Sequence, residues 1–127
     1  MGKEKGGIDE IWTHPFMTAR DLQTGIFWGD SLLWLDQIPC RVCISPELIL
    51  REYSLPEGVL KEILTVSFDQ PLALVHYEFP ASAQFKGFAV QAVFNSRFMW
   101  PYDVSATRSL TFDYDPVSQT LTTSSQD

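Results

Sequence analysis

Basic residues are scarce in this sequence. The 127 residues include 9 Lys or Arg against 16 Asp or Glu, and the formal net charge is −7. The imbalance is concentrated between Asp21 and Phe79, where nine acidic residues stand against three basic ones. Because nucleic acids and anionic membranes are bound by basic surfaces, this composition argues against both as partners. The acidic charge is better explained as a contribution to solubility.

Long hydrophobic runs and targeting signals are also missing. No apolar run approaches the roughly 18 residues that a transmembrane helix requires. The segment Met1–Gly7 is polar and glycine-rich, and no hydrophobic stretch of a secretory signal follows it. Gly2 is placed as in a myristoylation signal, but Gly6 stands where that signal needs Ser or Thr. We therefore expect a cytoplasmic protein with a flexible N-terminus at residues 1–7 and no membrane partner.

Motifs with catalytic or metal-binding spacing are few. The sequence has no serine-nucleophile motif, no phosphate-binding glycine loop and no paired-carboxylate signature. Its two cysteines, Cys40 and Cys43, form a lone C-x-x-C. We interpret them as small buried hydrophobic residues; the alternatives are a redox pair or a zinc site completed by His14 and His76. We expect no metal and no cofactor, and binding is favoured over catalysis.

Hydrophobic and aromatic residues, by contrast, are abundant. They make up 45% and 13% of the sequence, which is enough for the core of one β-rich domain over residues 8–127. Two strand-like segments, Leu72–Phe79 and Phe85–Phe94, flank the loop Pro80–Ala83. Their alternation predicts an antiparallel hairpin at the centre of the domain. Both faces of the second segment are largely apolar, so protein or a ligand is expected to cover both.

Other segments predict further strands and a helix. Gly29-Asp30 suits a type II′ hairpin turn between Ile26–Trp28 and Ser31–Leu35, because glycine accepts the positive φ of that turn. Ser45-Pro46-Glu47 has the composition of a helix start and predicts a helix to about Tyr53. The remaining expected elements are a brief helix or an extended lead-in at Ile8–Phe16, a polar connection or one helical turn at Thr18–Leu22, strands at Cys40–Ile44 and Ile63–Phe68, and a terminal hairpin of Leu110–Tyr114 with Thr120–Thr122.

Together these elements predict an α+β fold that is mainly β. About eight short strands are expected to form a strongly curved antiparallel sheet that closes as a small barrel or half-barrel. One or two helices accompany it, and the helix beginning at Ser45 packs on the sheet. An NTF2-like cone is the alternative architecture.

The leading functional hypothesis is a non-catalytic cytoplasmic binding or accessory protein. Small barrels often hold one apolar small molecule, and burial of its flat surface supplies the binding energy. Gly87, Ala89 and Ala92 leave space in their strand for a neighbouring aromatic ring or for a ligand. The expected ligand-binding residues are Trp28, Trp34, His76, Phe88, Phe94 and Trp100.

An interaction subunit of a homo-oligomer or a larger complex is the first alternative. The aromatic cluster Phe98, Met99, Trp100 and Tyr102, with Arg97 beside it, has the composition of a protein contact surface. The same aromatic residues could instead plug the open end of a barrel. A homodimer or a protein partner bound through this cluster is therefore one prediction from the sequence.

A small cone-shaped dehydratase or isomerase is the second alternative. In that hypothesis His76 is the general base, and Glu78 or Asp103 orients its imidazole. The non-catalytic interpretation of the same pattern is a half-exposed strand face that carries a solvated histidine and a solvated glutamate.

Overall fold

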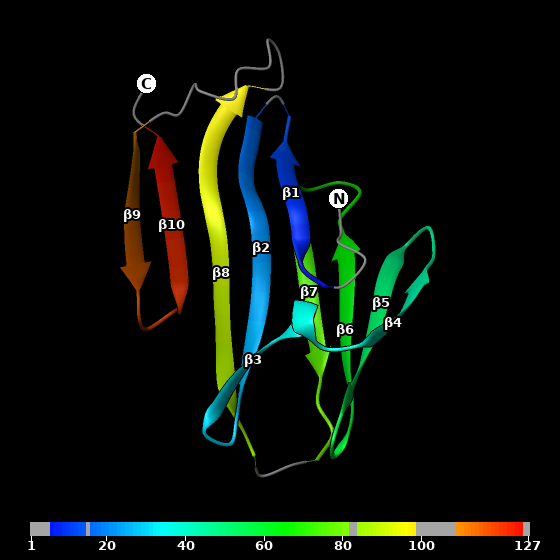
Figure 1. Cartoon of the computed structure of the whole chain (residues 1–127). Coiled ribbons are helices and arrows are strands. Elements are labelled where there is room, and N and C mark those ends of the chain that lie inside the picture. Colours follow the sequence, from blue (N-terminus) through cyan, green and yellow to red (C-terminus); the bar gives the residue numbers. More distant parts are fainter. Residues whose placement is uncertain (1–5, 15, 82–83, 99–108, 126–127) are drawn as a thin grey trace. The chain divides into compact units, whose positions relative to one another are not determined.

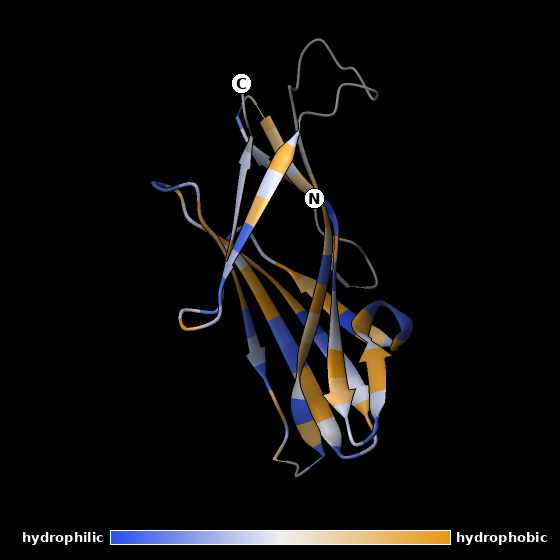
Figure 2. Cartoon of the chain, turned by 90° about the vertical axis from the view of Figure 1, so that its left-hand side faces the viewer, coloured by the Kyte–Doolittle hydropathy of each residue, from blue (hydrophilic) through white to orange (hydrophobic). Residues whose placement is uncertain are grey.

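The computed structural model describes residues 6–14, 16–81, 84–98 and 109–125 and, for residues 95–98 and 125, the backbone alone. Most of the described chain is β-strand (Figure 1). Hydrophobic and hydrophilic residues alternate along several strands, as expected where one face of a strand is buried (Figure 2). The chain divides into two compact units. Unit 1 is Met1, Ile8–Leu22 and Ala92–Asp127, and unit 2 is Gly2–Gly7 and Gln23–Gln91.

The described ranges contain ten strands. They are β1 (Ile8–Thr13), β2 (Phe16–Trp28), β3 (Ser31–Trp34), β4 (Cys40–Ile44), β5 (Leu48–Leu55), β6 (Gly58–Val66), β7 (Ala73–Glu78), β8 (Phe85–Phe98), β9 (Leu110–Asp115) and β10 (Thr120–Ser125). In one four-stranded sheet β2 pairs with β1, β3 and β8. A second sheet contains β4, β5, β6 and β7 in sequence order, and β9 pairs with β10.

The core of unit 2 combines residues from both four-stranded sheets. Ile26 and Trp28 of β2, with Leu35 of the short 3₁₀ helix η1 (Leu35–Gln37), pack in one cluster with residues of β5 and β6. The members from β5 and β6 are Tyr53, Leu55 and Leu60. The residues of β2 and η1 belong to the sheet that contains β3 or to the segment after it, and the residues of β5 and β6 belong to the other sheet. Their contact shows that unit 2 is built as two packed β layers.

Aromatic rings extend this packing between β7 and β8. Tyr77 of β7 lies 5.0 Å from Phe88 of β8, measured between ring centroids. Phe79, just after β7, lies 4.0 Å from Phe85 at the start of β8. The rings of each pair are tilted, by 43° in the first pair and 30° in the second. Because β7 pairs with β6 and β8 pairs with β2, these contacts join the two layers.

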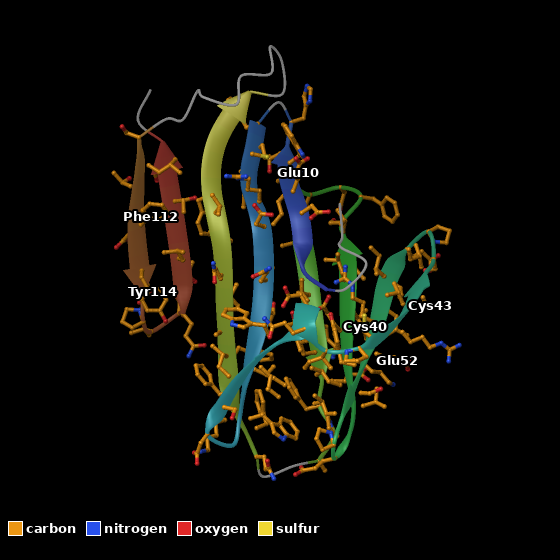
Figure 3. The ribbon with its side chains drawn as sticks, in the orientation of Figure 1. Glu10, Cys40, Cys43, Glu52, Phe112 and Tyr114 are labelled. Atoms are coloured by element: carbon orange, nitrogen blue, oxygen red, sulfur yellow. The ribbon has the colours of Figure 1, made fainter. Side chains whose placement is uncertain are left out.

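Unit 1 contains the hairpin of β9 and β10. Thr120 pairs with Asp115, and the ladder continues to Ser125 opposite Leu110. The Asp115 carboxylate accepts hydrogen bonds from the Ser118 hydroxyl at 2.6 Å and the Val117 N–H at 2.9 Å. These bonds, that of Ser118 above all, lower the pKa of Asp115. Phe112 and Tyr114 of β9 are exposed (Figure 3), although Phe112 also meets Phe94 edge-on at 5.9 Å.

Several local predictions are confirmed. The expected strand Cys40–Ile44 coincides with β4, and the terminal hairpin is present as β9 and β10. Trp28 pairs with Ser31 across Gly29-Asp30, and Gly29 has φ +60° while Asp30 does not have a positive φ, as a type II′ turn requires. The mainly β, antiparallel character of the fold is also confirmed.

The closed barrel, one of the two predicted forms of the sheet, is wrong, because the described strands lie in separate sheets that do not close on themselves. The central hairpin is wrong for a related reason. Leu72–Phe79 and Phe85–Phe94 do contain strands, but these strands belong to different sheets. Alternation shows which face of a strand is buried; it does not show which strand pairs with it. The number of strands is ten in the described ranges, against about eight expected.

The predicted helices are also wrong. Ser45–Tyr53 forms a turn and most of β5, and η1 is the one helical element of the described residues. A cone with packed α-helices is therefore not the architecture of this part of the chain. The extended alternative for Ile8–Phe16 is confirmed, because most of this segment is β1, whereas Thr18–Leu22 is part of β2 instead of a polar connection or a helical turn. The strand expected at Ile63–Phe68 is the end of β6. Within the same ranges no helix is long and apolar enough to cross a membrane.

Candidate functional site

An apolar groove lies at one end of the sheet β4–β7, within unit 2. It has a volume of about 340 Å³ and is partly open to solvent. Two loops of the chain frame it, the one between β4 and β5 and the one after β6. The lining residues are Ile44, Ser45, Pro46, Glu47, Leu48, Ile49, Leu64, Val66, Ser67 and Phe68. We refer to this set as the apolar groove.

The first loop owes its shape to Ser45. The Ser45 hydroxyl accepts hydrogen bonds from the N–H groups of Leu48 at 3.2 Å and Glu47 at 3.4 Å. The Ser45 N–H donates to the Leu48 carbonyl at 2.9 Å, so the chain reverses and β5 pairs with β4. A serine at a helix N-cap makes similar hydrogen bonds to following N–H groups, which explains why the sequence predicts a helix at this turn.

Burial along β6 shows where the groove opens. Leu60, Glu62, Leu64 and Val66 share one face of the strand, and their exposed fractions are 0%, 3%, 8% and 64%. Ile44 pairs with Ile49, and Ile49 pairs with Leu64, so the three residues lie on the same face of the sheet. The exposed fraction of Ile44 is 73%. The inner face of the sheet therefore ends in an apolar surface that the described residues leave open to solvent.

Phe68 completes the groove from the second loop. Its side chain is 95% exposed. The loop is held by a hydrogen bond from the Ser67 N–H to the Leu72 carbonyl at 2.9 Å and by one from the Ser67 hydroxyl to the Asp69 carboxylate at 2.6 Å. A phenylalanine this exposed on an ordered loop forfeits the hydrophobic stabilisation that burial would supply. Exposed apolar surface of this kind is typical of contact sites.

A buried ion pair lies farther along the same face of the sheet. Arg51 of β5 and Glu62 of β6 are paired in register, and both side chains are almost completely buried. Arg51 also donates from Nη2 to the Gly7 carbonyl at 3.1 Å. The Glu62 carboxylate additionally accepts hydrogen bonds from the hydroxyls of Tyr53 at 3.2 Å and Tyr77 at 3.3 Å. Hydrogen bonds of this kind offset the cost of removing the two charges from water.

The two tyrosines of this network are held protonated. Burial and the neighbouring Glu62 raise the pKa of Tyr53 far above its ordinary value, and the same two causes raise the pKa of Tyr77. The hydroxyls of Tyr77 and Thr24 are also hydrogen-bonded to each other, at 2.9 Å. Each phenol therefore serves as a hydrogen-bond donor to the carboxylate, which is a structural role within unit 2.

The glycines before β1 fit closely against this network. Gly6 has φ +110°, and a Cβ at this position would lie 2.6 Å from the Tyr53 hydroxyl oxygen. Gly6 and Gly7 are both buried. A residue with a side chain could not occupy position 6 without moving Tyr53. The two described residues of the predicted flexible segment are thus tied to the core of unit 2 by the Gly7 carbonyl and the close approach of Gly6.

The predicted ligand-binding residues are not gathered in the groove. Trp28 is buried in the core of unit 2. Trp34 is half-buried against Gly25, where a Cβ would lie 3.1 Å from the Trp34 ring. Phe88 belongs to the aromatic cluster of β7 and β8, and Phe94 lies in unit 1 beside Phe112. Trp100 lies outside the described residues, and so does most of the predicted contact cluster, Phe98–Tyr102, of which the backbone of Phe98 alone is described.

Two residues of the catalytic hypothesis, His76 and Glu78, lie on the face of the sheet opposite to the groove. His76 is exposed on β7, where it pairs with Ile63. Glu78 forms an ion pair with Lys61 at 3.3 Å, which holds its carboxylate beside a cation of β6. Asp103 lies outside the described residues. The described structure therefore supplies no acidic partner to orient the His76 imidazole.

The two cysteines, labelled in Figure 3, differ in burial. Cys40 is half-buried and packs against the core, whereas Cys43 is exposed. The interpretation as buried hydrophobic residues therefore applies to Cys40 and is wrong for Cys43. Residues three apart in a strand point to opposite faces, and Cys40 and Cys43 form no disulfide with each other. In the ranges that the structure describes, no cluster of three or more His, Cys, Asp or Glu is arranged to hold a metal ion.

The groove and the ion pair were both missed at the sequence level. A signal for the ion pair was present, because Arg51 alternates with Tyr53 and Leu55, and Glu62 alternates with Leu60 and Leu64. The helix predicted for Ser45–Tyr53 hid this alternation in the first segment.

Neither protein-family models, curated proteins nor solved structures provide a match to the chain.

Proposed function

We propose that this chain is a non-catalytic interaction module that contacts another polypeptide through the apolar groove. The observation that carries the proposal is the exposure of Ile44, Val66 and Phe68 around one groove of unit 2. Fully burying a side chain of this size stabilises a complex by roughly 1.5–3 kcal/mol. Two or three such side chains that become buried together form the centre of a typical contact site.

Two features of the groove support this role. Its loops are fixed by hydrogen bonds of Ser45 and Ser67, so little order has to be gained when a partner binds. The apolar side chains come from β4, β6 and the two loops, which gives a surface continuous over several elements. The proposal places the contact surface at the apolar groove of unit 2 instead of at the predicted cluster Phe98–Tyr102.

A small apolar ligand in the same groove is the second candidate. Its supporting observation is the volume of about 340 Å³, which lies at the lower end of the range for small-molecule sites. A ligand there would leave Phe68 at the rim with much of its ring exposed. A polypeptide can cover that ring as well as fill the groove, and this difference favours the interaction module.

Native mass spectrometry of the full chain, expressed in its own source, separates the two candidates. A polypeptide that adds its mass under native conditions and is lost on denaturation supports the interaction module, provided that the double variant Ile44→Ser/Phe68→Ser loses it. A matched control is Val117→Ser, since Val117 is 93% exposed but lies in the turn after β9. A small added mass points to the ligand, and a bare chain in every variant contradicts the proposal.

A further inference from the structure

Two carboxylates stand at the rim of the apolar groove. Glu47 lies in the Ser45 turn and is exposed, and its backbone N–H is held by the Ser45 hydroxyl. Asp69 directly follows Phe68, and its carboxylate accepts the hydrogen bond from the Ser67 hydroxyl at 2.6 Å. Each of the two loops that frame the groove therefore places one negative charge beside exposed apolar side chains.

The cations described on this sheet are engaged or face elsewhere. Arg51 is buried against Glu62. Lys61 pairs in register with Glu52 on one side and Glu78 on the other, on the face opposite to the groove, and forms its ion pair with Glu78. Arg41 pairs with Glu52 and so belongs to that same opposite face. The rim of the groove thus carries negative charge that these cations do not neutralise.

A second copy of the chain is a poor occupant for this surface. In a two-fold symmetric contact the same patch faces itself, so Glu47 and Asp69 would approach their own counterparts. The net charge of −7 adds a general repulsion between copies. A partner that carries positive charge beside its apolar residues would be attracted to these carboxylates, because opposite charges steer the encounter.

We infer that the apolar groove receives a polypeptide segment whose apolar side chains are flanked by Lys or Arg. This inference rests on the proposed function and adds the chemistry of the partner to it. The apolar side chains of the segment fill the groove beside Ile44 and Val66 and cover Phe68. The flanking cations lie toward Glu47 and Asp69, where they set the orientation of the segment and its preference over neutral or acidic sequences.

Three labelled peptides of equal length test the inference by fluorescence anisotropy against the full chain. Their central residues are Lys-Leu-Phe-Lys, Glu-Leu-Phe-Glu and Lys-Ser-Ser-Lys. At low ionic strength the first peptide is expected to bind about tenfold more tightly than the second, which corresponds to two exposed charge contacts. Raising the salt concentration to about 0.5 M should shrink that ratio toward one, because exposed charges are screened.

A charge reversal at the rim makes the test independent of folding. The variant Glu47→Lys/Asp69→Lys should bind the acidic apolar peptide more tightly than the basic one, a reversal that an unfolded protein cannot produce. The control variant Glu52→Lys/Glu78→Lys has the same net charge but carries the change on the opposite face. It should keep the original order of the peptides.

Three results would overturn the inference. Equal binding of the two apolar peptides shows that the rim does not select charge, and binding of Lys-Ser-Ser-Lys as tight as that of Lys-Leu-Phe-Lys shows that the groove is not used. Absence of binding by all three peptides also rejects the stated partner. In each case a polypeptide that is retained in native mass spectrometry and lost in Ile44→Ser/Phe68→Ser still supports the proposed function, so the two claims fail separately.

Discussion

Glu62 is the residue on which the buried polar network of unit 2 depends. It accepts hydrogen bonds from Arg51, Tyr53 and Tyr77 in an almost fully buried position. Glu62→Gln keeps the shape of the side chain but leaves the Arg51 charge without its counter-ion. We expect the free energy of unfolding to fall by about 3–5 kcal/mol, because an uncompensated buried charge is strongly unfavourable.

Urea denaturation at neutral pH measures this effect. The matched control is Glu78→Gln, which removes an ion pair of similar composition but with both side chains about half exposed. Exposed pairs contribute roughly 0–1 kcal/mol, so this variant should be nearly as stable as the parent. Equal destabilisation by the two substitutions would show that the Arg51–Glu62 pair has no special role.

Tyr53 and Tyr77 make stability depend on alkaline pH. Their pKa values are raised in the folded chain, by burial first and by Glu62 second, whereas in the unfolded chain they ionise near pH 10. Above pH 10 the unfolded state therefore holds fewer protons than the folded state, and the free energy of unfolding decreases as the pH rises. Each tyrosine contributes up to about 1.4 kcal/mol per pH unit to this decrease.

Tyrosinate absorbance at 295 nm provides the measurement. At pH 11 the folded chain should show less tyrosinate than the same chain in urea, and Tyr53→Phe/Tyr77→Phe should remove most of the difference. Equal absorbance of the folded and unfolded parent chain would mean that these phenols titrate normally.

Among the glycines that the structure describes, Gly6 leaves the least room for a side chain. Gly6→Ala places a methyl group 2.6 Å from the Tyr53 hydroxyl and forces alanine to φ +110°. We expect a loss of at least about 2 kcal/mol in the free energy of unfolding. At Gly29, φ is +60° and the nearest atom to an added Cβ is 3.6 Å away, so Gly29→Ala should lose only about 1 kcal/mol. Chemical denaturation ranks the two variants, and a smaller loss at Gly6 would contradict the observed packing.

At the scale of secondary structure, the loop between β4 and β5 is the element that forms the groove. Ser45→Ala removes the acceptor for the N–H groups of Glu47 and Leu48, and we expect a loss of about 1 kcal/mol, similar to that of a capping residue. Hydrogen exchange of the Leu48 amide should become faster than in the parent. Ser54→Ala, at an exposed position of β5, is the control, and unchanged exchange at Leu48 would argue against the turn.

The elements also show how far the sequence determines this fold. Local signals were sufficient for β4, for the Gly29 turn and for the β9–β10 hairpin, because each depends on residues close together in sequence. Ser45-Pro46-Glu47 failed as a helix signal because the serine hydroxyl forms similar hydrogen bonds in a β-turn. The partners of β7 and β8 could not be inferred, since strand pairing depends on contacts between distant residues.

At the scale of the whole molecule, the candidate site could not be read from the pattern of residues. The hydrophobic residues that the sequence singled out include Trp28, which fills the core, and Phe88, whose ring contacts Tyr77 although the residue is 44% exposed. Ile44, Val66 and Phe68 look equally apolar in sequence, and their exposure becomes visible only when the inner face of β6 is followed to its end. Burial is a property of the assembled sheets, so composition alone could not separate core from contact surface.

The central claim is that Phe68 and its groove contact another polypeptide. The most direct measurement is photo-crosslinking from position 68, with Phe68 replaced by a benzoyl-phenylalanine in the full chain expressed in its own source. The account predicts a discrete adduct with a second polypeptide from position 68, which the additional substitution Ile44→Ser weakens, and none from the equally exposed position 117. No polypeptide adduct from position 68, or an equal one from position 117, would contradict it.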